Sequence, residues 1–228
     1  MHSYGLNLSM IHHILITHDH ADHIKSVGSI SDSFNIPVYS TKAVHEGIAK
    51  NWCVKKKVSP NQVRYVEKGK TQQIGDFTVT PFAVPHDSSD CVGYCVQCEG
   101  ITFTLVTDCG HVTEEICAFV AKANYLVIEA NHEVEKLMAG PYPLYLKERI
   151  TSQIGHLSNA ECARTIVENA TENLKHVWLC HLSDENNHPE LARIAVTSLM
   201  ESYGLRAGVD FIVEVLRRKI PSEIYDLK

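Results

Sequence analysis

Short apolar runs that suit strands alternate along this chain with longer segments whose apolar positions recur at helical spacing. The β-branched, apolar run over residues 11–17 predicts a strand. A helical repeat follows over about 21–35, and a short strand over 36–40. Thr41 should cap a second helix, which runs to Lys50. The start of the chain therefore predicts strands and helices in turn.

From residue 62 to 107 the pattern changes to strands joined by turns, with a hairpin at Glu99-Gly100. Helices and strands alternate again afterwards. Helices are predicted to begin at Thr113, Ser158 and Pro189, and Glu161 stands in the capping-box position after Ser158. Strands are predicted over 125–130, 176–180 and 210–215. This order predicts a mixed α+β or α/β chain whose two sheets are covered by helices, a four-layer αββα sandwich. We find no linker or repeat, which predicts a single domain over residues 1–228.

The composition is that of a globular protein, with 228 residues of which 44% are hydrophobic. No apolar run approaches the roughly 20 residues that span a bilayer, and the N-terminus lacks the features of a signal peptide. Eight cysteines without a small-domain disulfide pattern favour a reducing cytoplasm. The net charge of -6 gives no general attraction for nucleic acid and does not exclude it. No membrane partner is expected, and the oligomeric state stays open.

The first predicted strand ends in an unusual cluster, with three histidines and two aspartates in the six positions from 18 to 23. Imidazole and carboxylate are ligands that borderline divalent metals prefer. His18 and His20 alternate and should point the same way, whereas Asp22 and His23 lie where the chain turns into a helix. One turn can thus offer ligands to two metal ions, and such a pair can activate water. The alternative is a polar loop with solvated histidines, which would need this crowding to arise by chance.

The segment Thr17-His-Asp-His-Ala-Asp-His23 resembles the HxHxDH motif of the metallo-β-lactamase-fold hydrolases. Later ligand positions of that superfamily follow in order: His86 in Val-Pro-His-Asp, Asp108 in Val-Thr-Asp-Cys and His181 in Leu-Cys-His-Leu. The resemblance implies the metallo-β-lactamase fold and two divalent metal ions, with zinc as the default and manganese or iron as alternatives. It assigns His18, His20 and His86 to one ion, Asp22, His23 and His181 to the other, and Asp108 to a bridge between them.

Within the superfamily, the chain is most similar to the YycJ/WalJ-like branch. The similarity lies in these segments: Val84–Tyr94, Thr107–Glu115, Glu129–His132, Gly140–Pro143, Leu146–Ile150, Gly155–Asn159 and His181–Asn187. Members of that branch act as 5′-to-3′ DNA exonucleases. The resemblance therefore implies a phosphodiesterase that acts on nucleic acid, with DNA as the expected substrate. A small-molecule ester, thioester or lactam hydrolase is the first alternative, and an inert metal-binding scaffold is the second.

Residues outside the ligand set should choose the substrate. Gly155-His156 resembles the segment in which tRNase Z-type phosphodiesterases place a histidine that assists the leaving group, so His156 is our candidate general acid, beside Asp22 as the other catalytic candidate. Lys147, Arg149 and His132 are candidate substrate-binding residues. The alternatives are a structural role for His156 and a solvated helix face for Lys147 and Arg149. For His132 and Glu129, support of the metal ligands and a catalytic role are both expected possibilities.

The remaining histidines, cysteines and a lysine cluster suit structural roles. His12, His13, His45, His176 and His188 lack ligand spacing and should lie at the surface or in packing contacts. Cys91, Cys95 and Cys98 lack a fourth zinc ligand, and buried thiols are expected at Cys91 and Cys95. Cys109 and Cys180 should pack beneath the metal site. Residues 55–57 are three lysines, which favour a solvated surface over a phosphate contact.

The start of the chain departs from the family pattern. Family members begin with further strands before the HxHxDH strand, whereas only residues 1–10 precede it here. We therefore expect a fragment, a misassigned start or an incomplete N-terminal sheet. Without those strands one sheet would expose an edge, so we expect this chain by itself to lack full activity.

Overall fold

The computed structural model of the chain describes residues 4–5, 7–218 and 220–228. Its internal contacts form two compact units, which are considered one at a time. The N-terminal unit comprises Met1–Pro81 and Asp87–Val92, and the C-terminal unit comprises Phe82–His86 and Gly93–Lys228. Within the described part of the chain, no helix has the length and apolar character needed to cross a membrane.

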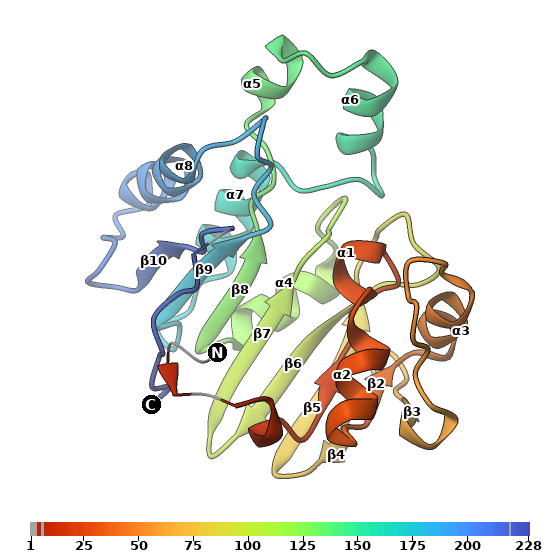
Figure 1. The fold of residues 1–228 in the computed structure, drawn as a ribbon. Coiled ribbons are helices and arrows are strands. Elements are labelled where there is room, and N and C mark those ends of the chain that lie inside the picture. The colour runs from red at the N-terminus through yellow and green to blue at the C-terminus, as the bar shows by residue number, and fades with distance from the viewer. Residues whose placement is uncertain (1–3, 6, 219) are drawn as a thin grey trace. The chain divides into compact units, whose positions relative to one another are not determined.

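The N-terminal unit is built on a parallel sheet of three strands in the order β1-β2-β3 (Figure 1). The strands are β1 (Ile14–Leu15), β2 (Val38–Ser40) and β3 (Val63–Tyr65). Its helices are α1 (Ala21–Ile24), α2 (Val27–Phe34) and α3 (Lys42–Lys50), and short 3-10 turns cover Leu8–Met10 and Pro60–Gln62. A hairpin of β4 (Gln72–Ile74) and β5 (Phe77–Ala83) completes the unit. The sheet, with its helices, sets the direction in which the chain leaves β1.

Local interactions explain α3. The Thr41 hydroxyl accepts a hydrogen bond from the Val44 amide at 3.4 Å, which confirms the predicted cap. Val44 and Ile48 lie one helical turn apart and are buried at 0% and 1% exposure. They pack in a core that also contains these residues: Ile16, Ile24, Val27, Val38 and Val54. Burial of this apolar stripe holds α3 against the sheet.

The predicted helix over 21–35 is wrong as a single element. It is broken at Lys25 and Ser26 into α1 and α2, and the apolar Phe34 near its end is 40% exposed. Ser26-Val-Gly-Ser29 is poor in helix formers, which gives the break a local cause. Gly28 also lies so close to Lys56 that a Cβ would sit 1.8 Å from its carbonyl oxygen. Close approach to that loop therefore directs α2.

The C-terminal unit is a sheet in the order β10-β9-β8-β7-β6. The strands are β6 (Val92–Cys98), β7 (Ile101–Val106), β8 (Tyr125–Glu129), β9 (His176–Cys180) and β10 (Ile212–Val215). β6 and β7 form the predicted hairpin, in which Glu99 and Gly100 both have positive φ, and the other neighbours are parallel. The carboxyl ends of β7, β8 and β9 therefore meet at one edge of the sheet.

Helices connect these parallel strands, as a parallel sheet requires. They are α4 (Glu114–Lys122), α5 (Val134–Ala139), α6 (Leu144–Ile150), α7 (Asn159–Asn169) and α8 (Pro189–Ser202), and α7 packs against α4 and α8. Pro189 opens α8 and Thr113 caps α4, as predicted. The helix α5 was not predicted from the sequence; it buries Leu137 and leaves Val134 and Met138 exposed. Sheets covered by helices confirm the predicted mixed class.

The capping box of α7 gives a test of local stability. Ser158 is buried, its hydroxyl accepts from the Glu161 amide at 3.2 Å, and Glu161 accepts from the Ser158 amide at 3.2 Å. Ser158→Ala is expected to lower the free energy of unfolding by about 1–2 kcal/mol, because amides at the start of α7 lose a partner. Urea unfolding measures this loss. The exposed Ser202→Ala should change it by less than about 0.5 kcal/mol, and an equal loss in both variants would contradict the assignment.

Candidate metal centre

The N-terminal unit brings the histidines of the motif together directly after β1. The His18 ring lies 4.7 Å from the His20 ring and 4.2 Å from the His23 ring, measured between centroids. His20 donates from Nε2 to the Asp87 carbonyl at 3.1 Å, so Nδ1 is the acceptor nitrogen of its neutral ring. Asp22 has a largely exposed side chain, 3.6 Å from His23 Nε2. We call His18, His20, Asp22 and His23 the N-terminal cluster.

Asp19, which the sequence left without a role, anchors this turn. Its carboxylate accepts hydrogen bonds from the Ser89 amide at 3.1 Å and the Ser89 hydroxyl at 2.6 Å. Its backbone carbonyl accepts from Asn51 Nδ2 at 3.0 Å. A Cβ on Gly47 would lie 1.9 Å from the carboxylate, so only glycine leaves room for it. These contacts fix the backbone between His18 and His20.

In the C-terminal unit, three acidic or imidazole side chains stand at the carboxyl ends of neighbouring strands. Asp108 follows β7, Glu129 ends β8 and His181 follows β9. Asp108 and His181 have φ angles of 53° and 55°, in the left-handed region that non-glycine residues seldom adopt. Strained backbone of this kind concentrates at functional sites. Asp108 is 2% exposed, and its Oδ2 accepts from the Thr107 hydroxyl at 2.7 Å.

Glu129 organises this end of the sheet. It is fully buried, and its Oε1 accepts from His156 Nδ1 at 2.8 Å and from His181 Nδ1 at 2.7 Å. Its Oε2 accepts from the backbone amides of Cys109 at 2.8 Å and Leu157 at 3.1 Å. Burial alone would raise the pKa of the Glu129 carboxyl, but the hydrogen bonds and charge of the two histidines hold the pKa well below its usual value. An ionised Glu129 therefore places a hydrogen on each Nδ1.

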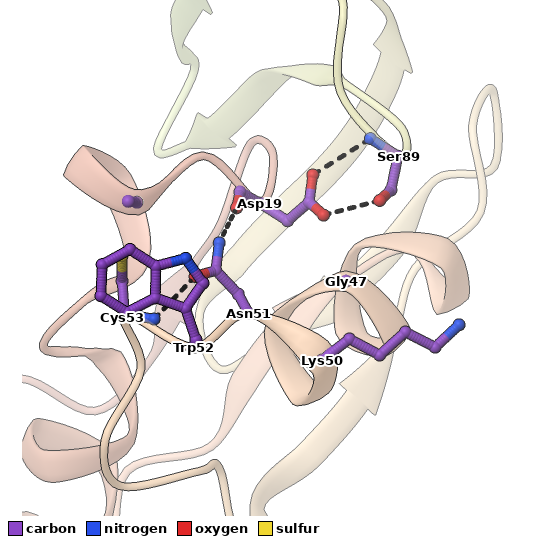
Figure 2. Close-up of a pocket in the computed structure, with 8 residues that line it drawn as sticks. Asp19, Gly47, Lys50, Asn51, Trp52, Cys53 and Ser89 are labelled. Atoms are coloured by element: carbon purple, nitrogen blue, oxygen red, sulfur yellow. Dashed lines mark hydrogen bonds between the residues drawn. The ribbon is translucent and has the colours of Figure 1, made fainter.

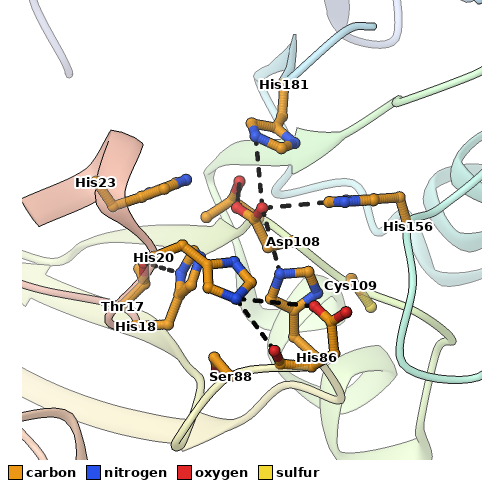
Figure 3. Close-up of polar contacts among 12 residues, drawn as sticks. Thr17, His18, His20, His23, His86, Ser88, Asp108, Cys109, His156 and His181 are labelled. Atoms are coloured by element: carbon orange, nitrogen blue, oxygen red, sulfur yellow. Dashed lines mark hydrogen bonds and ion pairs between the residues drawn. The ribbon is translucent and has the colours of Figure 1, made fainter. Parts of the chain in front are cut away.

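The orientation of the histidines fits a divalent cation. His86 donates from Nδ1 to the Gly155 carbonyl at 3.0 Å, as His181 does to Glu129, so Nε2 is the acceptor nitrogen of each neutral ring. These Nε2 atoms lie 3.7 Å and 3.4 Å from Oδ1 of Asp108. Three atoms with lone pairs thus approach one another, and a cation would offset the repulsion. Figure 3 shows the three side chains turned toward one another.

His156 belongs to the same group. One polar atom from each of Asp108, Glu129, His156 and His181 lies within 4.8 Å of the others. The His156 Nδ1 atom is 4.0 Å from Oδ1 of Asp108. The tight turn before it needs Gly155, since a Cβ there would lie 2.2 Å from the Ile150 carbonyl oxygen. With His86, these four residues form what we call the C-terminal cluster.

Within each unit, the predicted metal ligands thus lie close together. That the two clusters share metal ions stays a prediction. The sequence allows either a catalytic or a supporting role for Glu129. Its signal there is a carboxylate at the end of a run that is otherwise apolar, Tyr125-Leu-Val-Ile. A charge in such a strand needs partners, which the two histidines supply.

The candidate substrate-binding residues His132, Lys147 and Arg149 all lie in the C-terminal unit. His132 is 2% exposed, and burial lowers its pKa. Lys147 donates from Nζ to the carbonyls of Met138 at 2.7 Å and Gly140 at 2.8 Å, which ties α6 to the end of α5. A substrate contact by His132, Lys147 or Arg149 stays a prediction.

The cysteines behave as packing residues. Cys91 and Cys95 are buried as expected. Cys109 is buried and Cys180 is partly buried, and burial raises the pKa of both thiols far above the usual value.

Comparison with known proteins bears on these clusters. Residues 3–181 match the family described as the Beta-lactamase superfamily domain. Exodeoxyribonuclease YycJ of Bacillus anthracis is 33% identical over 223 residues, which cover 96% of this chain and 82% of the relative. Exodeoxyribonuclease WalJ of Streptococcus pneumoniae serotype 2 is 36% identical over 200 residues, which cover 88% of this chain and 74% of the relative.

Solved structures give the same fold. The metallo-β-lactamase fold protein YhfI from Bacillus subtilis matches with a TM-score of 0.66 at 17% identity, covering 91% of this chain and 76% of that protein. The fold and the resemblance predicted from the motifs are both confirmed. The chain therefore belongs to the metallo-β-lactamase superfamily of hydrolases and, within it, to the YycJ/WalJ-like branch.

Proposed function

We propose that this hydrolase is a phosphodiesterase that digests DNA from its 5′ end. Relatives at 33% and 36% identity carry the name exodeoxyribonuclease. The observation that carries the proposal is the contact of His156 with the buried Glu129 at 2.8 Å. A phosphodiester has a poor leaving group that needs a proton, and a histidine held by a carboxylate can supply it.

Two divalent ions would be held by the residues that the motifs indicate. His18, His20 and His86 would bind one, Asp22, His23 and His181 the other, and Asp108 both. Because imidazole dominates the donor set, we propose zinc, with manganese and iron as alternatives. When bound, such ions lower the pKa of water and offset charge that develops on the attacked phosphate.

The chain's own groups would then position the reactants and move one proton. Asp22, with its exposed carboxylate beside His23, is assigned to orienting the attacking water as well as to binding. As the bond from water to phosphorus forms, the bond from phosphorus to the 3′ oxygen breaks. His156 donates its Nε2 proton to that oxygen while Nδ1 stays bonded to Glu129, which stabilises the charged imidazolium before transfer.

Labelled substrates test the function. Metal-loaded protein would be incubated with DNA and RNA that carry a label at the 5′ or the 3′ end, with zinc, manganese or iron in turn. We expect the 5′ label to be released first as a short product and the 3′ label to remain on strands that shorten progressively. Absence of cleavage with every metal, or turnover of carboxylic esters or lactams alone, would refute the proposal.

His156→Ala tests the proton transfer. We expect kcat on DNA to fall by about 10²–10⁴-fold, the usual contribution of general acid catalysis. A p-nitrophenyl phosphodiester should lose much less, because its leaving group needs no proton. Metal content is measured alongside, and His12→Ala, which removes an exposed histidine, is the matched control. Equal losses on both substrates would contradict the role of His156 as acid.

A further inference from the structure

A tryptophan stands in solvent beside a pocket of the N-terminal unit. Trp52 is 88% exposed, whereas Trp178, the other tryptophan of the chain, is 3% exposed. The pocket has a volume of about 520 Å³, and Asp19, Gly47, Lys50 and Ser89 also line it (Figure 2). Small-molecule sites commonly measure roughly 300–1,000 Å³. The space is therefore large enough for a planar ring system against the indole.

The turn that carries Trp52 is held on both sides. Asn51 donates from Nδ2 to the Asp19 carbonyl at 3.0 Å and accepts from the Cys53 amide at 3.0 Å. Its carbonyl accepts from Lys57 Nζ at 2.5 Å. Val54, two residues after Trp52, is 1% exposed and belongs to the core. The indole is thus exposed on a fixed backbone, so little further ordering of the backbone is needed when a ligand stacks on it.

Lysines flank Trp52 in the sequence, at positions 50 and 55–57. Lys50 and Lys55 are exposed, and in the described part of the chain neither forms an ion pair. Lys56 is paired with Asp32, and Lys57 is bonded to carbonyls. The carboxylate that lines the pocket, Asp19, already accepts two hydrogen bonds from Ser89. These neutral donors leave the negative charge of Asp19 in place, so the lining carries one charge of each sign, and Lys50 is the cation that a phosphate can contact.

The pocket is continuous with the histidine turn. Asp19 and Ala21 line it, and in the sequence they alternate with His18, His20 and Asp22 of the N-terminal cluster. A ligand in the pocket would therefore lie against the same turn that presents the proposed metal ligands. An extended ligand with repeated charges could occupy both places at once.

We infer that Trp52 and Lys50 form a subsite for single-stranded DNA, in which Trp52 stacks on an unpaired base and Lys50 contacts an adjoining phosphate. The inference rests on the proposed function for its choice of ligand. Aromatic platforms beside cationic side chains are the general means by which proteins hold single strands without reading their sequence. The site would hold the strand while its scissile phosphate is at the metal centre.

Binding to metal-loaded protein tests the subsite without relying on turnover. A fluorescein-labelled phosphorothioate oligodeoxynucleotide, which resists hydrolysis, would be titrated and followed by anisotropy. Trp52→Ala is expected to weaken binding by roughly 5- to 100-fold, the range for loss of one stacked base, and Trp52→Phe to keep most of the affinity. Lys50→Ala should reduce the slope of log Kd against log salt by about 0.7. Tyr203→Ala, at an exposed aromatic residue of the C-terminal unit, is the control.

Two further readouts separate this inference from the proposed function. Stacking should quench tryptophan fluorescence of the wild type and leave Trp52→Phe unquenched. An abasic phosphorothioate strand, which carries phosphates but no base to stack, should bind Trp52→Ala as tightly as it binds the wild type. If wild type digests DNA but Trp52→Ala binds the oligonucleotide as wild type does, the subsite is refuted and the proposed function stands.

The remaining outcomes are equally decisive. Binding that depends on Trp52 without digestion of any strand supports the subsite and refutes the exonuclease. No binding and no digestion refutes both. Equal weakening by Trp52→Ala on a closed circular duplex and on a single strand also overturns the inference, because bases stacked inside a duplex have no exposed face for the indole.

Discussion

Asp108→Asn is expected to reduce DNA digestion by two orders of magnitude or more and to lower the metal content below that of the wild type. Asparagine keeps the shape of aspartate and tolerates the left-handed backbone at φ 53°, so the turn after β7 should survive. Its amide oxygen can still accept from Thr107. What is lost is the negative charge that faces the His86 and His181 nitrogens at 3.7 Å and 3.4 Å. Losing several kcal/mol of charge stabilisation corresponds to a rate loss of at least about 100-fold.

Metal content by mass spectrometry and digestion of labelled DNA measure the two effects separately. Asp76→Asn removes the same charge from the exposed turn between β4 and β5, and should change neither. Two ions per chain together with full activity in Asp108→Asn would contradict the proposed bridge. Two ions with a large loss of activity would limit the role of Asp108 to catalysis.

What the sequence predicted best were features that depend on neighbours along the chain. The caps at Thr41, Thr113 and Ser158 and the hairpin at Glu99-Gly100 need contacts only a few residues apart, and the structure has them all. Two of the histidines that were predicted to be structural also contact near neighbours along the chain. His188 caps α8 by accepting from the Glu190 amide, and His176 stacks on Trp178 with ring centroids 4.0 Å apart.

What the sequence could not give depends on contacts between distant segments. The break between α1 and α2 reflects weak helix formers together with the approach of Gly28 to Lys56, a residue 28 positions away. The left-handed backbone at Asp108 and His181 has no signature in residue type, because both are ordinary L residues. Ligand identity could be predicted from motif order, whereas ligand orientation required coordinates.

Glu129 is the clearest such case. Its two imidazole partners, His156 and His181, come from turns 27 and 52 residues later. No local pattern joins these three positions, although the branch resemblance includes each of them. The parallel order of β8 and β9 brings them to one edge. A buried acid in an apolar strand signals that partners exist and does not identify them.

The last and most stringent test follows from that geometry. Glu129→Gln is nearly isosteric, but Glu129 accepts four hydrogen bonds, two from histidine Nδ1 atoms and two from backbone amides. Glutamine offers one oxygen and one NH₂ group, so one pair of donors must face another donor. If the NH₂ group faces the two amides, these lose their acceptor. If it faces the histidines, each must move its hydrogen to Nε2, and His181 would then present a hydrogen to Asp108 instead of a lone pair.

Either arrangement is unfavourable, and the loss is detected in two measurements, metal affinity and the free energy of unfolding. Metal affinity, measured by competition with a chelating dye, is expected to fall by about 10–100-fold, as for other residues that orient metal-binding histidines. The free energy of unfolding of chelator-treated protein should fall by about 1–3 kcal/mol, because buried donors lose an ionised acceptor. Glu172→Gln, at an exposed position, should change neither. If Glu129 fixes which nitrogen of His181 binds metal, removing its charge must weaken the metal site. Lower stability with unchanged metal affinity would therefore mean that Glu129 only stabilises the ends of the strands.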